Sequence, residues 1–290
     1  MSRAIIEHQL DSQSFETLAK LAYHESGLRL VSAKASMIQS RLRHRLRALG
    51  LNDFAEYAAL VCSEGGREER RQMISALTTN VSHFFRERHH FDLLADKIAA
   101  EYLPRLKAGG RLRIWSAGCS NGQEACSIAM TLLEKAPDIG SYDVRILATD
   151  IDPNVIAFSR SGEYPERLIN GIPPELLAKY FEPSRQDYET TYRICPSMRL
   201  LVKYHELNLF ADWPMKQSMD VIFCRNVVIY FDLPSQNHLW PRFRQSLSPG
   251  GFLFLGHSER IVEPEKYGFA SCGPTTYRPT ASLPGVQLMN

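Results

Sequence analysis

Three short apolar segments constrain the fold of this chain more than any other feature. They read RLRIWSA (111–117), DVRILATD (143–150) and MDVIFCRN (219–226), and helical or loop sequence separates them. Strands that alternate with helical segments are typical of a parallel β-sheet with helices on its faces. We therefore predict an α/β domain at residues 96–280, followed by a loose C-terminal tail at residues 281–290.

The residues before this domain show a different periodicity. Apolar side chains recur at helical spacing in three stretches, around Leu18, Leu42 and Tyr57, and glycines separate these stretches. Residues 1–78 are therefore predicted to form a small all-helical domain. Residues 79–95 contain possible helix caps followed by an amphipathic pattern, and we predict that they form a linker helix.

A third region, near the middle of the α/β domain, alternates short β-prone runs around a Pro-Ser pair. It reads YETTYRICPSMRLLVKYHEL, residues 188–207. Such alternation predicts a small antiparallel β insert, which we place at about residues 186–207. Its expected turn, ICPSMR, is short and contains no glycine.

Composition and charge exclude several classes of protein. The 290 residues are 44% hydrophobic and carry a net charge of +2, which is too mild to indicate wholesale binding to nucleic acid or membrane. The six cysteines form neither a C-x-x-C pair nor a zinc-like cluster with histidine, so we expect reduced thiols and no metal site. The N-terminus lacks a signal-peptide core and no apolar run could span a bilayer, so we expect a cytoplasmic protein without membrane insertion.

The turn after the first apolar segment, WSAGCSNGQEACS (115–127), admits two interpretations. Gly118, Ser120 and Gly122 fit the G-x-S-x-G pattern of serine hydrolases, and Asp220 or Asp232 and His257 follow in a suitable order. A nucleophile turn of that kind follows several earlier strands and needs an oxyanion loop upstream. The sequence before Leu112 is helical, which disfavours the hydrolase interpretation.

The second interpretation is a cofactor site. Small residues in a turn between a strand and a helix let the backbone approach a ligand, and Asp150 ends the next strand, where an acid can accept hydrogen bonds from a ribose diol. Glu124 at the helix start would repel a diphosphate and attract a positive charge, which favours S-adenosylmethionine over a dinucleotide. From spacing alone, both carboxylates could equally be helix caps or solvated side chains.

Several stretches together resemble the chemotaxis receptor methyltransferases, the CheR family. These stretches are LTTNVSHFFRERHHF, WSAGCSNGQEACSIAM, ATDID, NLF, FCRNVVIYFD and LSPGGFLFLGHSE, between Leu77 and Glu259. The resemblance implies a Rossmann-like methyltransferase domain after the helical one. It also implies methyl transfer from S-adenosylmethionine to glutamates in the cytoplasmic domains of methyl-accepting chemotaxis receptors, with S-adenosylhomocysteine as product. We expect a monomer that does not bind nucleic acid.

The resemblance also implies the site residues. The family's cofactor contacts fall on Asn80, Ser82, Arg86, Glu124, Asp150, Asn208, Leu209, Asn226 and Val227. Arg86 and Tyr230 correspond to the arginine and tyrosine near the transferred methyl group, and we take them as the catalytic residues. The chain departs from the family pattern at Ser82, where threonine is usual, and at Ala125-Cys126, where Pro-Tyr is usual. Ser82 keeps the hydroxyl, so we expect cofactor binding to be retained.

A basic helical stretch, QSRLRHRLRAL, suggests how a partner docks. Leu42, Leu46 and Leu49 share a buried face, and the rest of the surface carries Arg41, Arg43, Arg45 and Arg47. A solvated basic face is the simpler explanation, but the resemblance favours docking of a glutamate-rich receptor helix. The family's β insert captures a receptor peptide in some members; the short turn here favours an enzyme that needs no such tether. A methyltransferase for another substrate and a cofactor-binding module without catalysis remain alternatives.

Overall fold

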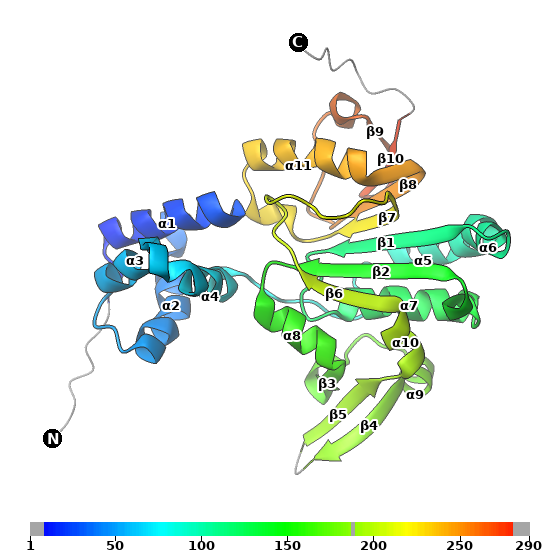
Figure 1. The fold of residues 1–290 in the computed structure, drawn as a ribbon, viewed down its shortest axis with the longest axis horizontal. Helices are drawn as coiled ribbons and strands as arrows, with labels where there is room; N and C mark the ends of the chain where they lie inside the picture. Colours follow the sequence, from blue (N-terminus) through cyan, green and yellow to red (C-terminus); the bar gives the residue numbers. More distant parts are fainter. Residues whose placement is uncertain (1–8, 187–188, 281–290) are drawn as a thin grey trace.

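The computed structural model describes residues 9–186 and 189–280. Its first part is a bundle of four helices: α1 (Ser12–Ser26), α2 (Ala35–Leu49), α3 (Phe54–Cys62) and α4 (Arg67–Leu77). Two short 3-10 turns, η1 (Ser32–Lys34) and η2 (Glu64–Gly66), connect them. Asp11 and Asp53 cap α1 and α3 by accepting backbone N–H groups, and the helices enclose one apolar core. The predicted all-helical domain is therefore confirmed (Figure 1).

The main sheet has seven strands in the order β6-β2-β1-β7-β8-β10-β9. The first five pair in parallel, and the last two pair antiparallel at one edge. The strands are β1 (Arg111–Ala117), β2 (Asp143–Asp150), β6 (Val202–Glu206), β7 (Met219–Cys224), β8 (Leu247–Leu255), β9 (Phe269–Gly273) and β10 (Thr276–Pro279). All three apolar segments that predicted strands form strands of this sheet, so the predicted α/β fold is confirmed.

Helices pack on both faces of the main sheet. One face and its core are covered by α5 (His89–Lys97), α7 (Gln123–Lys135) and α10 (Pro196–Leu201). A π-helical turn, η3 (Ile98–Tyr102), joins α5 to α6 (Leu103–Lys107). The opposite face carries α11 (Leu233–Ser246), which buries Trp240 and Phe243. Successive strand residues alternate between the two cores: Ile114 contributes to the first and Trp115 to the second.

The remaining helices are short or lie at the rim of the sheet. They are η4 (Ile139–Ser141), α8 (Pro153–Ser161), η5 (Glu166–Leu168), α9 (Pro174–Tyr180), η6 (Val228–Tyr230) and η7 (Pro264–Tyr267). Of these, α8 and η6 matter most for function because each begins within a few residues of the end of a strand, β2 or β7. None of the helices within residues 9–186 and 189–280 is both long and apolar enough to cross a bilayer.

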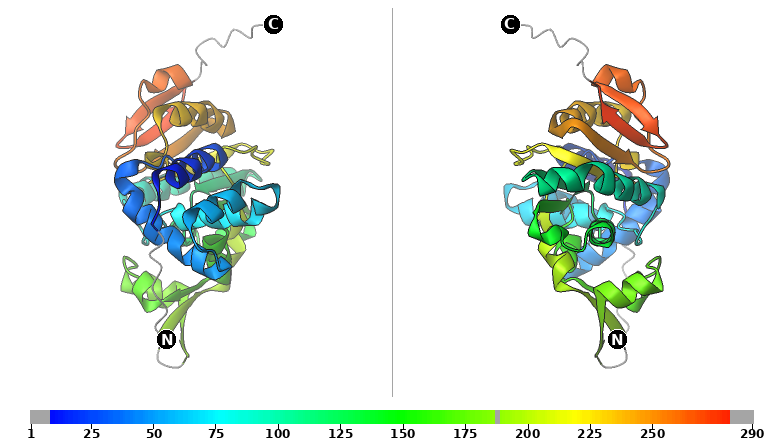
Figure 2. Two further views of the ribbon diagram at one scale, coloured as in Figure 1. Left: turned by 90° about the vertical axis from the view of Figure 1, so that its left-hand side faces the viewer. Right: turned by 90° about the vertical axis from the view of Figure 1, so that its right-hand side faces the viewer.

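The small antiparallel sheet exists, but its expected limits of 186–207 are wrong. It consists of β3 (Glu163–Pro165), β5 (Glu189–Ile194) and β4 (Phe181–Gln186), in that order. The two turned views show β4 and β5 projecting away from the main sheet (Figure 2). The Pro-Ser pair is not a hairpin turn, because Pro196 is the first residue of α10, a position that proline favours. The following run, Val202–Glu206, is strand β6 of the main sheet.

Two other expectations differ from the structure or fall outside it. The linker helix was placed at residues 79–95, but residues 79–88 are not helical and α5 begins only at His89. Phe85 and Glu87 in this stretch have positive φ angles of 53° and 56°, which no α-helix contains. The tail expected at residues 281–290 lies outside the described residues.

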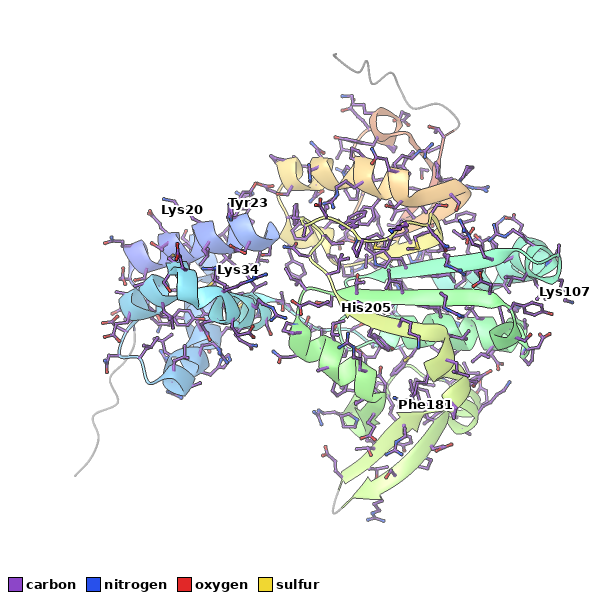
Figure 3. The ribbon with its side chains drawn as sticks, viewed as in Figure 1. Lys20, Tyr23, Lys34, Lys107, Phe181 and His205 are labelled. Atoms are coloured by element: carbon purple, nitrogen blue, oxygen red, sulfur yellow. The ribbon has the colours of Figure 1, made fainter. Side chains whose placement is uncertain are left out.

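The helical domain lies against the carboxyl ends of the parallel strands. Tyr23, near the end of α1, is on the side of that domain facing the sheet, whereas Lys107, just before β1, lies at the far edge (Figure 3). Asn208, after β6, donates to the Glu25 carbonyl (2.6 Å), and Arg29 N–H donates to the Tyr230 carbonyl (3.1 Å). These contacts join the domains at the sheet edge where α/β proteins bind ligands.

Candidate active site

A pocket opens between the helical domain and the carboxyl edge of the sheet. It encloses about 1020 Å³, part of which is open to solvent. The pocket brings together all the residues that the sequence assigned to the cofactor and to catalysis: Asn80, Ser82, Arg86, Glu124, Asp150, Asn208, Leu209, Asn226, Val227 and Tyr230. Their contacts with a cofactor stay predictions, but their convergence is a property of the fold.

The glycine turn after β1 forms the floor of this pocket. Gly118 and Gly122 have φ angles of 84° and 78°, and the N–H groups of Gly118 and Cys119 both donate to the Thr149 carbonyl at 2.8 Å. A Cβ atom at Gly118 would lie 2.3 Å from Cγ2 of Val227. The turn therefore needs glycine at position 118 for its conformation and for the close approach of the loop after β7.

The same geometry excludes the serine hydrolase interpretation. Among the described residues, Ser120 Oγ has no hydrogen-bond partner. Asp220 binds Arg105 and the backbone of β1, and Asp232 caps α11. His257 Nδ1 lies 2.8 Å from Glu87. None of the expected partners of a catalytic serine is paired with another, so no triad is formed.

Asp150, the last residue of β2, is held by backbone groups. Its two oxygens accept hydrogen bonds from the N–H groups of Ser120 (2.8 Å) and Asp152 (3.0 Å). Burial raises the pKa of Asp150 from 3.8 to about 6, although these two hydrogen bonds oppose the shift. Each carboxylate oxygen keeps a free lone pair, so the group can still accept from the two hydroxyls of a ribose.

Glu124, in the first turn of α7, also lines the pocket. One oxygen accepts from Ser116 Oγ at 2.6 Å and the other from Arg225 Nη1 at 3.1 Å. Burial raises the pKa of Glu124, and Arg225 and Ser116 oppose this rise. The Glu124 carboxylate is therefore held by two hydrogen bonds, one of them from a cation, and it lines the pocket.

Arg225 was not among the predicted site residues, yet it organises this wall of the pocket. Its side chain is 2% exposed and pairs with both Glu124 and Glu87 (3.2 Å), and Nη2 also donates to the Arg86 carbonyl. Burial opposes the charge of Glu87, but hydrogen bonds from His257 and the charge of Arg225 lower its pKa to about 2. Two carboxylates share one buried guanidinium, which leaves the cluster of these three side chains with a net negative charge.

Family models match nearly the whole chain. The all-alpha domain of CheR methyltransferases matches residues 13–78, and their SAM-binding domain matches residues 80–277. The chain belongs to the CheR methyltransferase family. It is therefore a methyltransferase that uses S-adenosylmethionine. The family membership that the sequence motifs indicated is confirmed.

Proteins from the family are similar over most of their length. A probable chemotaxis protein methyltransferase from Rhizobium etli is 46% identical over 260 residues, covering 90% of this chain and 97% of that protein. Chemotaxis protein methyltransferase 2 from Pseudomonas aeruginosa is 41% identical (94% and 95% covered), and the Escherichia coli chemotaxis protein methyltransferase is 38% identical (92% and 91%). A solved methyltransferase from Mesorhizobium loti covers 57% of this chain and 54% of its own at 18% identity, with a TM-score of 0.29.

The pocket fits the cofactor of the CheR family. S-adenosylmethionine carries a cationic sulfonium and ammonium at one end and a ribose diol in its centre. The anionic cluster around Glu124 suits the cationic end, and the acceptor pair of Asp150 suits the diol. Ser120 also lines the pocket, and its hydroxyl, which has no hydrogen-bond partner in the described part of the chain, adds a polar group that a ligand can satisfy.

Glu259, a buried carboxylate, is a second residue that sequence reasoning missed, and it shapes the loop after β7. Glu259 is 4% exposed and accepts backbone N–H groups from Asn226 (2.8 Å), Val227 (2.8 Å), Ile229 (3.2 Å) and Gly256 (2.6 Å). Burial raises its pKa, and the four donors oppose the rise. Asn226 is held at a φ of 59° in this loop, which then turns into η6 and Tyr230. Glu259 therefore fixes the backbone of one wall of the pocket.

The catalytic candidates lie on the loops that border the pocket. Arg86 is half-buried, and its Nη1 donates to the Val81 carbonyl at 3.1 Å, which leaves further donors of the guanidinium for a substrate. Tyr230 is half-buried on η6 and packs against the core of the helical domain. Both side chains line the pocket that also contains Glu124 and Asp150.

The four arginines of α2 do not form one free basic face. Arg41 donates to the Leu77 and Thr78 carbonyls (2.7 and 2.8 Å), and Arg45 pairs with the buried Glu69 at 2.5 Å. Arg43 is half-buried and Arg47 is exposed. Two of the four side chains predicted to dock a substrate are thus engaged within the helical domain. In the part of the chain that the structure describes, no three His, Cys, Asp or Glu side chains group as a metal site.

Proposed function

We propose that this CheR-family enzyme methylates glutamate side chains in the cytoplasmic domains of chemotaxis receptors. The products are glutamate 5-O-methyl esters and S-adenosylhomocysteine, and the reaction serves sensory adaptation. The family match over both domains and the names of the similar proteins support this proposal. The observation that carries it is the convergence of Arg86 and Tyr230 on the pocket that contains Glu124 and Asp150.

Methylation of a carboxylate requires positioning more than proton transfer. A glutamate with an ordinary pKa near about 4.3 is already ionised at neutral pH, so no general base is needed. When bound, S-adenosylmethionine supplies a methyl group on a sulfonium, and that sulfur leaves as a neutral thioether. Holding the two reactants in line can contribute roughly 7–11 kcal/mol in well-arranged systems.

Each candidate side chain has a distinct task in this arrangement. Asp150 would hold the ribose and Glu124 the cationic end of the cofactor. Arg86 would pair with the substrate carboxylate through a charge-assisted hydrogen bond, and Tyr230 would donate to it or border the methyl group. The helical domain would exclude water from the inner end of the pocket, where its residues Leu28 and Ile74 form part of the wall.

The direct test is methyl transfer to receptor fragments. Purified enzyme is incubated with methyl-labelled cofactor and a panel of receptor cytoplasmic fragments, and the labelled protein is then treated with alkali. We expect receptor labelling that alkali releases, because methyl esters hydrolyse and N-methyl groups do not. Alkali-stable label, or no label on any fragment from an enzyme that binds the cofactor, would contradict the proposal.

Docking of the receptor is expected to depend on Arg43 and Arg47, the two arginines of α2 without the internal carbonyl or carboxylate contacts of Arg41 and Arg45. Reversal of both to Glu should weaken affinity for a receptor fragment about threefold to tenfold, as for charges at an interface rim. Lys107 and Arg111, both exposed at the opposite edge of the sheet, provide a control with the same charge change. Equal affinities for the two double variants would remove α2 from the docking surface.

A further inference from the structure

Asp152 is a buried carboxylate that has no place among the site residues described above. It is 2% exposed and lies two residues after Asp150, at the start of α8. Its Oδ1 caps α8 by accepting the Asn154 N–H at 2.9 Å. A helix cap needs only one oxygen, so the further contacts of Asp152 require another explanation.

Those further contacts come from the helical domain and from the linker. Ser75 Oγ, near the end of α4, donates to Oδ1 at 2.7 Å, and Asn80 Nδ2 donates to Oδ2 at 2.7 Å. Asn154 Nδ2 also donates to Ser75 Oγ at 2.9 Å, which closes the network. One side chain therefore joins α4, the linker and α8.

Asp152 is also hydrogen-bonded to Asp150, the carboxylate proposed to bind the ribose. The Asp152 N–H donates to Asp150 Oδ1 at 3.0 Å. Between them, Ile151 lines the pocket and packs against the apolar core of the helical domain. A shift of α4 or of Asn80 would thus be transmitted to Asp150 through one residue.

The helical domain is itself part of the pocket wall. Ser26, Leu28, Ile74 and Thr78 line the pocket together with the strand ends of the methyltransferase domain. The pocket is therefore complete only when the helical domain is docked on the sheet. A ligand that binds the complete pocket must favour the docked arrangement, and by linkage the docked arrangement must favour the ligand.

We propose that Asp152 is a positioning residue that couples docking of the helical domain to cofactor binding. It does so by holding Asn80 and the end of α4 against the Asp150 corner, without touching the cofactor itself. The proposal rests on the proposed cofactor roles of Asn80 and Asp150. It makes the helical domain part of the cofactor site and not only a surface for the receptor.

The decisive variants change Asp152 or its partner in the helical domain. Asp152→Asn keeps the shape but turns an acceptor into an N–H donor that faces either Asn80 or Ser75. Ser75→Ala removes the hydroxyl of α4 alone. Ser63→Ala is the matched control, because Ser63 lies in the same domain and, within residues 9–186 and 189–280, its hydroxyl donates only to the nearby Leu60 carbonyl (2.7 Å).

Calorimetry of the full chain with S-adenosylmethionine and with S-adenosylhomocysteine measures the coupling. We expect Kd for both to rise about tenfold in Asp152→Asn and about threefold to fivefold in Ser75→Ala, and to stay within about 1.5-fold in Ser63→Ala. The KM for the cofactor should rise in parallel, while kcat at saturating cofactor stays near the wild-type value. A residue that only braces the fold would lower the melting temperature of the free protein and leave Kd unchanged.

Hydrogen exchange provides the reciprocal measurement. Cofactor should slow exchange of the backbone N–H groups of residues 75–80 in the wild-type protein, and this protection should be reduced in Asp152→Asn. Unchanged Kd in both folded variants, or equal protection in wild type and Asp152→Asn, would overturn the proposal. A wild-type enzyme that binds the cofactor but labels no receptor would refute the glutamate proposal and leave this one standing.

Discussion

Asp220 and Asp150 are buried carboxylates at opposite ends of the parallel strands of the main sheet. Asp220 lies at the amino edge, where the strands begin, and Asp150 at the carboxyl edge, where they end. Asp220, near the start of β7, is 5% exposed; it pairs with Arg105 at 2.8 Å and accepts the Arg113 N–H at 2.8 Å. Asp150, at the end of β2, is 8% exposed and accepts two backbone N–H groups in place of a cation. The first carboxylate is neutralised within the fold, whereas the second keeps acceptor capacity that faces the pocket.

The difference shows how to separate a structural carboxylate from a functional one. A buried charge costs free energy unless it is paired. A carboxylate with a purely structural role is therefore expected to have a cation beside it. At a ligand-binding site, part of the stabilisation of the buried carboxylate comes from the ligand itself. Substitutions at the two edges should therefore fail in different ways: loss of ligand binding or turnover at the carboxyl edge, and loss of stability at the amino edge.

The largest effect is expected at the two proposed catalytic residues. Arg86→Ala should lower kcat about 100-fold to 1000-fold, as expected when a preorganised donor to the reacting group is removed. Tyr230→Phe should lower kcat about tenfold through loss of one hydrogen bond. Turnover is measured with receptor fragment and cofactor both saturating. Arg88→Ala is the control, because Arg88 is the neighbouring arginine but is 65% exposed and pairs with Asp92. Wild-type kcat in Arg86→Ala would end its assignment as a catalytic residue.

An intermediate effect is expected from the titration of Asp150. If the ionised carboxylate binds the ribose hydroxyls, the Kd for S-adenosylmethionine should rise up to about tenfold between pH 7 and pH 5, because the pKa of Asp150 is about 6. Asp150→Asn should raise Kd about tenfold at pH 7 and abolish this pH dependence. Calorimetry across this range checks both. An equally steep pH profile in Asp150→Asn would assign the titration to another group.

The stability of the cofactor-free protein should respond to Asp150 in the opposite direction. Its folded-state pKa of about 6 lies above the ordinary 3.8, so folding favours the protonated carboxyl. The stability that this provides is fully present below about pH 3.8 and is lost as the pH rises through 6. At neutral pH, ionised Asp150 therefore strengthens cofactor binding but lowers the free energy of unfolding of the cofactor-free protein.

The smallest effect on function is expected at the amino edge. Asp220→Asn should lower the free energy of unfolding by about 1–3 kcal/mol, because Arg105 and the Arg113 N–H lose their anionic partner. The Kd for S-adenosylmethionine should not change. Urea denaturation and calorimetry on the same preparation test both statements. A higher Kd with an unchanged free energy of unfolding would show that the amino and carboxyl edges are not independent.

Local signals in the sequence predicted the strands, the glycine turn, Glu124 and Asp150, whereas other pocket residues, such as Arg86 and Tyr230, were predicted from the resemblance to the CheR family. Apolar strands followed by Gly118 or Asp150 mark the carboxyl edge directly, and parallel strands must bring these ends together. The insert was misplaced because alternation looks the same in any sheet: Glu189–Ile194 and Val202–Glu206 are both strands, but of different sheets. Pro196 was read as a turn residue, although proline is equally suited to begin a helix.

Arg225 and Glu259 were missed because their partners are distant in the chain. Arg225 meets Glu124 and Glu87 across 101 and 138 positions, and Glu259 binds the loop after β7 across about 30. One signal was nonetheless available for Arg225. It directly follows the wholly buried strand Met219–Cys224, where an arginine must find an anion. Nothing comparable marks Glu259, whose donors are all backbone groups.

The contact between Gly118 and Val227 has a consequence for inherited variation in such enzymes. Any side chain at position 118 would meet Cγ2 of Val227 at 2.3 Å and push the loop that leads to Tyr230. A substitution in this glycine turn would then also displace Tyr230, the proposed catalytic tyrosine. Because Gly118 itself lines the pocket, one substitution should impair both S-adenosylmethionine binding and turnover of the methyl acceptor.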